Sequence, residues 1–229
     1  LISPSWKIPR NSVFVSLYIY NLHKYYKQRA KPYTMHRNFH TVRRSSSFPS
    51  PCVMGGESIM TRKKHGTSNT PVQTNLRWGC DRDLADRICN FNRHGAESYC
   101  YLFKTSFLKD TREGQLQQQQ EEKNENSEQT QYEITFYDSN TGKPLFIAPR
   151  GGRTLDQFLK ESIDHGWPSF RDEEVIWENV RCLPNGEAVS VDGTHLGHNL
   201  PDRKGSRYCI NLVSVAGSPT IGANVGSSA

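Results

Sequence analysis

The residues best suited to chemistry lie together near the C-terminal end of the chain. Cys209 stands two residues after Arg207 and two before Asn211, so a strand would place all three side chains on one face. A guanidinium beside a thiol favours the thiolate, which is the nucleophilic form of cysteine. His195 and His198 precede this strand in a glycine-containing loop, where a tight turn would direct both rings to one point. The set predicts a nucleophilic sulfur with a neighbouring cation, an amide donor and two groups that transfer protons.

Each of these residues also has a simpler explanation when taken alone. A single cysteine in a strand is most often a small buried hydrophobe, and Trp167 alone would be assigned to the core. His195 and His198 have the spacing of a metal pair, but no third ligand stands at a suitable spacing. The combination of thiol, cation, amide and histidines favours the catalytic interpretation.

The elements that would position these residues are mostly short strands. Residues 132–137 alternate apolar and polar side chains, and the turn at 140–143 leads into a second strand. Thr154 and Gln157 have the spacing of a capping box, which predicts a helix with one apolar face. Further strands are predicted over 174–183, 188–192 and 206–216. One helix with several evenly spaced strands predicts a small, mainly β domain.

The rest of the chain carries weaker signals. Asp81 and Asp83 would cap a short helix over 81–91. Residues 113–131 are polar and Gln-rich, which predicts a flexible insertion because they bury little apolar area. In chain order, the predicted organisation is a basic, disordered leader over 1–75, a helix with an aromatic extension over 76–112, the insertion over 113–131, the main domain over 132–217 and a disordered tail over 218–229.

Charge is distributed unevenly along the 229 residues. The net charge is +6, but residues 1–56 hold nine Lys and Arg and no Asp or Glu, so the remainder carries −3. A basic tail on a slightly acidic domain argues against nucleic-acid binding, and no apolar run is long enough to span a membrane. The acid-free, Arg- and Ser-rich stretch over 35–50 predicts a transit peptide for a mitochondrion or a plastid. A leader without an address, on a cytoplasmic protein, is the alternative.

Three motifs in a fixed order carry a family resemblance. They are GWPSF at 166–170, HLGHNLPD at 195–202 and RYCIN at 207–211. Together they resemble the B-type peptide-methionine (R)-S-oxide reductases (methionine sulfoxide reductase B, MsrB) over roughly residues 132–217. The resemblance implies a β-tent, a fold of two small antiparallel sheets, here with one or two short peripheral helices.

The resemblance also implies an activity and roles for the matching residues. The implied catalytic residues are Cys209, His195, His198, Arg207 and Asn211, and the implied substrate-binding residues are Trp167, Phe170 and Asp202. Trp167 would form an apolar wall for the methyl group of the sulfoxide. The activity would be protein repair under oxidative stress, with oxidised proteins or free methionine sulfoxide as the substrate.

The implied chemistry suits these residue types. Sulfoxide sulfur is a modest electrophile, so its reduction needs a thiolate and protonation of the departing oxygen. Arg207 would hold the thiolate, and His195 or His198 would deliver the proton. Release of methionine would leave Cys209 as a sulfenic acid, which an external thiol (thioredoxin, glutaredoxin or glutathione) reduces. We expect no bound cofactor and a monomeric protein.

The chain departs from the family pattern at two places. Many members have a resolving cysteine directly before the Gly-Trp pair, where this chain has His165. Cys182 would replace it if its strand neighbours that of Cys209; simple burial of Cys182, with recycling by a small thiol or a redoxin, is the alternative. Many members also bind zinc through two CxxC pairs. The equivalent positions here are Asp138, Thr141, Val189 and Asp192, so we expect no structural zinc.

Two further classes of function remain open at this stage. A non-catalytic ligand-binding module with the same β-tent architecture is the main alternative, because a fold does not dictate a function. Such a module has no need for a thiol, a cation and two histidines in one place. A metal-dependent enzyme built on His195 and His198 lacks further ligands. The six cysteines contain no CxxC pair, which favours reduced thiols in an intracellular compartment.

Overall fold

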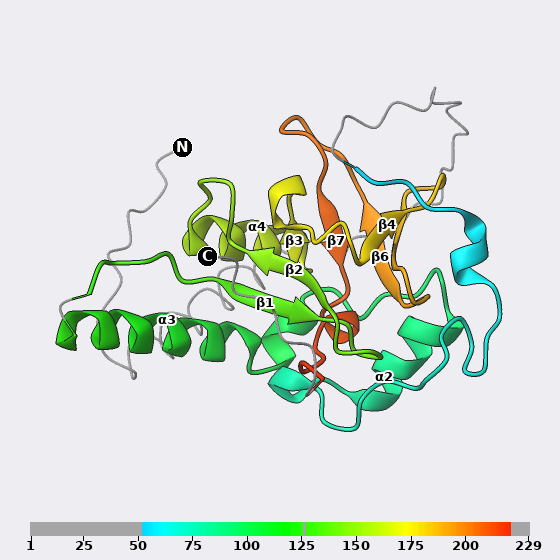
Figure 1. The fold of residues 1–229 in the computed structure, drawn as a ribbon, viewed down its shortest axis with the longest axis horizontal. Helices are drawn as coiled ribbons and strands as arrows, with labels where there is room; N and C mark the ends of the chain where they lie inside the picture. Colours follow the sequence, from blue (N-terminus) through cyan, green and yellow to red (C-terminus); the bar gives the residue numbers. More distant parts are fainter. Residues whose placement is uncertain (1–51, 126, 221–229) are drawn as a thin grey trace.

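The computed structural model describes residues 52–125 and 127–220. In these residues the chain forms seven strands in two antiparallel sheets, with three α-helices around them (Figure 1). The predicted mainly β class with two small antiparallel sheets and peripheral helices is therefore confirmed. The stretch expected to be a transit peptide, 35–50, lies outside the described residues. No helix in the described ranges is long and apolar enough to cross a membrane.

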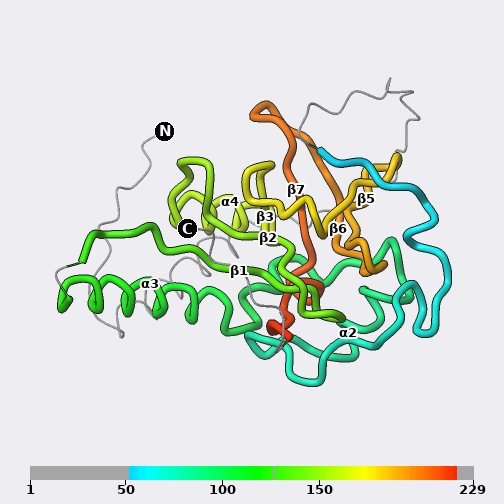
Figure 2. The backbone as a smooth tube through the Cα atoms, viewed as in Figure 1, coloured from blue at the N-terminus to red at the C-terminus, as the bar shows by residue number. Residues whose placement is uncertain are grey.

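The larger sheet has five strands in the order β3-β7-β6-β5-β4, and every neighbouring pair is antiparallel. Its strands are β3 (Ser169–Phe170), β4 (Val180–Cys182), β5 (Glu187–Ser190), β6 (His195–Asn199) and β7 (Tyr208–Ile210). The smaller sheet pairs β1 (Ile134–Tyr137) with β2 (Pro144–Ala148). Figure 2 shows β7 near the middle of the molecule, between the β1–β2 hairpin and the strands β5 and β6.

The helices are α2 (Arg82–Asp86), α3 (Phe107–Asn124) and α4 (Leu155–His165), and a π-helical turn, Arg87–Phe91, extends α2. Two of them begin as the sequence predicts. The Asp81 carboxylate accepts a hydrogen bond from the N–H of Leu84, and Thr154 and Gln157 form both halves of a capping box. Short 3-10 turns span Glu57–Met60, Arg77–Gly79, Tyr101–Lys104, Asp172–Glu174 and Leu212–Ser214.

The core lies where the five-stranded sheet, the β1–β2 hairpin and α4 meet. Phe170 of β3 stacks on Phe146 of β2, with ring centroids 4.2 Å apart. Phe136 of β1 and Phe158 of α4 complete a cluster of four fully buried rings. Burial of such rings is a large favourable contribution to folding, and it fixes β3 against the hairpin and helix.

The Gln-rich segment does not form the flexible insertion that its composition predicted. Residues up to Asn124 belong to α3, which extends away from the two sheets in Figure 1. Phe107 and Leu108 bury the start of the helix in the core. Gln118 donates a hydrogen bond to the Thr130 hydroxyl at 2.7 Å. Gln and Glu are good helix formers, so a helix anchored at one end needs little apolar surface of its own.

The predicted strand boundaries were too long in the second half of the domain. The segment 174–183 contains only β4 at its end, and 206–216 contains β7 followed by a 3-10 turn. Residues 195–198, predicted as a loop, belong to β6.

Candidate active site

One row of side chains crosses four strands of the larger sheet. Ser169 of β3 faces Cys209 of β7, Cys209 faces His198 of β6, and His198 faces Glu187 of β5. Directly opposed residues of antiparallel strands share a face and have Cβ atoms about 4.5–5.5 Å apart. Cys209 is a partly exposed residue. The sheet therefore brings the predicted nucleophile next to one of the two predicted histidines.

A β-bulge brings the second histidine to the same face. Gly197 pairs with Ala188 and His195 with Val189, so Leu196 is an extra residue in β6. Residues three apart in a regular strand point to opposite faces, and one inserted residue reverses this. The centroids of the His195 and His198 rings are consequently only 5.7 Å apart.

Gly197 is required at this bulge. Its φ is +155°, and a Cβ there would lie 2.1 Å from the carbonyl oxygen of Cys209. Only glycine allows β6 to approach β7 so closely at this point.

His195 is buried and its ring is fully hydrogen-bonded. Nδ1 lies 2.8 Å from a carboxylate oxygen of Glu187, and Nε2 lies 3.2 Å from the carbonyl oxygen of Gly95. Both partners are hydrogen-bond acceptors, and between them they hold the ring at both of its nitrogens. Burial would raise the pKa of Glu187, but hydrogen bonds from His195 and Arg93 outweigh it and hold the pKa at about 2.

His198 is the histidine that is free to exchange a proton. Within residues 52–125 and 127–220, no hydrogen bond joins the His198 ring to another residue. Both ring nitrogens of His195, by contrast, are already hydrogen-bonded. Burial lowers the pKa of His198, and the charge of His195 lowers it further. The ring of His198 is therefore neutral at pH 7 and able to accept a proton from its neighbour Cys209.

Arg207 contacts the thiol of Cys209, as the sequence predicts, but the net effect on the thiol differs from the prediction. Burial raises the pKa of Cys209, and the charge and hydrogen bond of Arg207 only oppose this rise. The resting sulfur is accordingly a thiol. Arg207 lowers the pKa of Cys209, as expected from the sequence, but the cost of burying a charged sulfur is larger.

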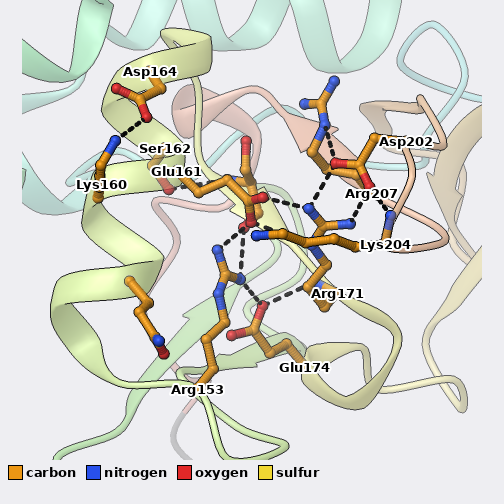
Figure 3. A network of polar contacts seen from close by, with 12 residues as sticks. Arg153, Lys160, Glu161, Ser162, Asp164, Arg171, Glu174, Asp202, Lys204 and Arg207 are labelled. Carbon is orange, nitrogen blue, oxygen red and sulfur yellow. Dashed lines mark hydrogen bonds and ion pairs between the residues drawn. The ribbon is translucent and has the colours of Figure 1, made fainter. Parts of the chain in front are cut away.

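A network of ion pairs fixes the position of Arg207 (Figure 3). The Nε of Arg207 lies 3.8 Å from the carboxylate of Asp202. Asp202 in turn accepts hydrogen bonds at 3.1 and 2.8 Å from the two terminal nitrogens of Arg171. Arg171 also pairs with Glu161, which Arg153 contacts at 2.5 Å. The hydrogen bond from Arg171 lowers the pKa of Asp202 to about 2.

This placement adds a role for Asp202 to the one expected. The family resemblance implied a substrate-binding residue, which stays a prediction; in the structure both carboxylate oxygens of Asp202 accept hydrogen bonds from protein donors, and the residue lies on the exposed β6–β7 turn. Asp202 thus links Arg171 to Arg207.

Asn211 also holds the site together. Its amide nitrogen donates to the carbonyls of Leu196 and Gly95, and its oxygen accepts from the N–H of Glu97. Asn211 is buried, so it joins the bulge of β6 to a segment more than 100 residues earlier in the chain. It orients His195, with which it shares the carbonyl of Gly95.

The segment 93–99 forms a wall of the site that sequence reasoning missed. Arg93 donates two hydrogen bonds to Glu187 through Nε and one through Nη2 at 2.7 Å. The Glu97 carboxylate accepts from the N–H groups of Leu212 and Val213, directly after β7. Burial raises the pKa of Glu97 to about 8. From its aromatic content the sequence predicted only that this stretch packs on the domain. Contacts between residues about 100 positions apart in the chain leave no pattern among neighbouring residues.

Trp167 stands beside β7 with a second aromatic residue. The carbonyl of Pro168, the next residue, accepts from the N–H of Ile210. Tyr99 meets the Trp167 ring edge-on, with centroids 5.6 Å apart. Gly166 has a φ of +85° and ends α4, and a Cβ there would lie 2.5 Å from the Tyr99 ring. Trp167 and Tyr99, both partly exposed, give one side of the site an apolar surface.

Two predicted residues do not belong to the site. Phe170 points to the opposite face of β3 from Ser169 and is fully buried in the aromatic core, so it cannot touch a substrate. Cys182 faces Ala188, Ala188 faces Gly197, and Gly197 faces Ile210, the neighbour of Cys209 in β7. Cys182 therefore lies on the opposite face of the sheet from Cys209. It is also three strands away, about 14 Å at the usual strand spacing. A disulfide needs Cα atoms within about 7 Å, so Cys182 cannot resolve Cys209 in this fold.

The two turns at which the resemblance would place zinc are held together by hydrogen bonds and an ion pair between their own side chains. Asp138 is buried and accepts hydrogen bonds from the Thr194 hydroxyl at 2.9 and 3.0 Å. Lys143 and Asp192 form an ion pair of 2.9 Å between the same turns. Among the described residues no group of three or more His, Cys, Asp or Glu is arranged to hold a metal ion. The expected lack of structural zinc stays a prediction.

A groove of about 540 Å³ lies beside the site, between α4 and the segments 150–153, 171–173 and 204–206. Its lining includes His165 and residues of the charged network of Figure 3, among them Arg153, Glu161 and Arg171, but not Cys209 or Arg207. The arginines that face it are already paired with carboxylates. The groove is therefore next to the thiol site and separate from it. His165 ends α4 and is exposed at its rim.

Comparison of the chain with protein-family models, with curated proteins and with solved structures gives no match. The assignment of function therefore depends on the geometry of the site and on the motifs that it contains.

Proposed function

We propose that the protein is a thiol-dependent oxidoreductase that reduces methionine R-sulfoxide, free or in a polypeptide, through Cys209. The observation that carries the proposal is the position of the partly exposed residue Cys209 between Arg207, which contacts its thiol, and His198, which faces it across the sheet. The apolar surface of Trp167 and Tyr99 suits the methyl group of the substrate.

In the proposed first step the Cys209 thiol passes its proton to the neutral ring of His198. The thiolate attacks the sulfoxide sulfur while Arg207 balances its charge. His198 returns the proton to the sulfoxide oxygen, which moves from the substrate sulfur to the sulfur of Cys209 as the bond between the two sulfurs breaks, and methionine leaves. The oxygen stays on Cys209 as a sulfenic acid.

Two equivalents of an external thiol complete the cycle. The first forms a mixed disulfide with Cys209 and releases water, and the second displaces Cys209 as a thiol. The net reaction converts methionine sulfoxide and two thiols into methionine, a disulfide and water. Because Cys182 lies on the other face of the sheet, we propose that thioredoxin, glutaredoxin or glutathione attacks Cys209 directly.

The role of His195 in this proposal is electrostatic. Glu187 and Gly95 hold its ring beside His198, and together with burial the electrostatic effect of His195 lowers the pKa of His198, which is therefore neutral and able to act as a base. Of the two histidines that the sequence offered as proton donors, His198 then carries the proton, and Asn211 helps to position His195 through the carbonyl of Gly95.

A non-catalytic ligand-binding module is the second candidate. It is favoured by one observation, the raised pKa of Cys209, which leaves the resting sulfur protonated and weakly nucleophilic.

One assay separates the two candidates. Each epimer of a dabsylated methionine sulfoxide is incubated with the full chain and dithiothreitol. The proposal expects turnover of the R epimer and none of the S epimer, and loss of turnover in Cys209→Ser. Cys80→Ser is the matched control, because Cys80 is buried and distant in sequence from the site motifs. Absence of turnover of either epimer would favour the binding module.

A further inference from the structure

Two cysteines, Cys52 and Cys182, meet on the opposite face of the sheet from Cys209. The segment following residue 52 runs along β4 at the edge of the sheet (cyan in Figure 1). The N–H of Cys182 donates to the carbonyl of Val53 at 3.0 Å, and the N–H of Gly55 donates to the carbonyl of Cys182 at 2.8 Å. Met54 thus pairs with Cys182 in a parallel bridge.

This backbone pairing brings the side chain of Cys52 to that of Cys182. The two thiols share a hydrogen bond, and Cys52 packs against the core cluster that contains Cys182. Cys182 is fully buried, whereas Cys52 is partly exposed. Solvent and small reagents therefore reach the pair through Cys52.

The surroundings of the pair favour ionisation of the exposed member. The hydrogen bond from Cys182 lowers the pKa of Cys52, a hydrogen bond with Tyr208 adds to this, and the pKa falls to about 7 although burial and Asp172 oppose the change. The pKa of Cys182 is raised by the same hydrogen bond. By contrast, burial raises the pKa of Cys80 and of Cys89.

We propose that Cys52 and Cys182 form a redox-active dithiol, which a small disulfide of the glutathione type oxidises to a disulfide bond that fastens the segment 52–55 to β4. The hydrogen-bonded pairing of the two chain segments and the contact between the two thiols carry this proposal. It stands independently of the activity proposed for Cys209, which lies on the other face of the sheet.

The oxidation proceeds by two thiol–disulfide exchanges. The Cys52 thiolate attacks one sulfur of glutathione disulfide, the sulfur–sulfur bond breaks, and one glutathione thiolate leaves and takes a proton from water. The sulfur of Cys182 then attacks the sulfur of Cys52 and displaces the second glutathione, which takes the proton of Cys182. Two protein thiols are oxidised, and one glutathione disulfide is reduced to two glutathione molecules.

The full-length chain, fully reduced, is incubated with glutathione disulfide, then alkylated in denaturant, digested without reduction and analysed by mass spectrometry. We expect a linked peptide pair containing Cys52 and Cys182, lighter than the two reduced peptides by two hydrogen atoms. The same pair is expected in Cys209→Ser. Recovery of Cys52 and Cys182 as alkylated thiols, or a link from either one to another cysteine, would overturn the proposal.

Two serine variants separate the steps. In Cys182→Ser the hydroxyl still donates to Cys52 but cannot form a disulfide, so glutathione should accumulate on Cys52. In Cys52→Ser the buried Cys182 should remain a free thiol. Absence of glutathione from Cys52 in the first variant, or modification of Cys182 in the second, would contradict the assignment of Cys52 as the attacking residue.

A rate measurement on the native chain needs no variant. Cys100 is the matched control, because it is also partly exposed but burial raises its pKa. At pH 7 iodoacetamide should alkylate Cys52 at least about five-fold faster than Cys100. The larger thiolate fraction of Cys52 speeds the reaction, and the lower nucleophilicity of a thiolate with a low pKa offsets only part of this gain. Equal rates would show that Cys52 is not activated and would overturn the proposal.

Discussion

Replacement of Glu187 by glutamine tests the buried charge that organises the site. The carboxylate accepts hydrogen bonds from His195 and Arg93, and its side chain is 1% exposed. Glutamine has the same shape and retains one accepting oxygen, so Glu187→Gln removes the charge and leaves the packing intact. The His195 ring and the Arg93 guanidinium then face a neutral amide instead of a carboxylate.

The cost follows from the pKa of Glu187. A fall from the ordinary value of 4.5 to about 2 corresponds to roughly 3 kcal/mol, at about 1.4 kcal/mol for each pKa unit. Removal of one partner from a buried ion pair costs a similar amount, about 3–5 kcal/mol. Because the folded-state pKa is depressed, this stabilisation is fully present above pH 4.5 and is lost as the pH falls through about 2.

Urea unfolding at pH 7, followed by circular dichroism, measures the difference. We expect Glu187→Gln to lower the free energy of unfolding by about 3 kcal/mol. Glu178→Gln is the matched control, because Glu178 is exposed, and it should change the free energy by less than about 0.5 kcal/mol. If Glu187→Gln is as stable as this control, the buried ion pair with His195 is refuted.

Three further changes test individual contacts. His198→Gln should lower kcat/KM by about 100-fold or more. In the wild type, activity should fall only below pH 6.5, since the lowered pKa of His198 keeps its ring neutral above that value. A loss of activity that begins above pH 6.5 as the pH is lowered would contradict this. Arg207→Gln should raise the pKa of Cys209 further and slow its alkylation at pH 8, whereas an unchanged rate would remove Arg207 from contact with the sulfur. Phe170→Ala should cost about 3–5 kcal/mol of unfolding free energy without changing KM; a raised KM with unchanged stability would return Phe170 to the substrate site.

Elements specified by neighbouring residues were predicted well from the sequence. The Thr154 capping box marks the start of α4, and the alternation at 132–137 marks β1. The proximity of Cys209 to Arg207 was predicted for the same reason, since strand alternation places residues two apart on one face.

Features that depend on distant segments were not predicted. The bulge at Leu196, which changes the 195–198 segment from an expected loop to a strand with both histidines on one face, is fixed by β5 and β7. The pairing of Arg93 with Glu187 joins parts of the chain 94 residues apart. Burial of Cys209 is likewise a tertiary effect, so its pKa could not be inferred from the motif.

The Gln-rich helix shows a different limit of sequence reasoning. Low apolar content predicts disorder for an isolated segment, but α3 is continuous with Phe107 and Leu108, which the core holds. Once its first turn is fixed, the costly nucleation step is already complete and good helix formers extend it.

A single-turnover experiment without added thiol tests the central claim most directly. The reduced chain is mixed with an equimolar amount of methionine R-sulfoxide and a 1,3-diketone that traps sulfenic acid. The account predicts close to one methionine released per chain, with the diketone attached to Cys209 alone. Methionine release with Cys209 still free to alkylate, or equal consumption of the S epimer, would contradict it.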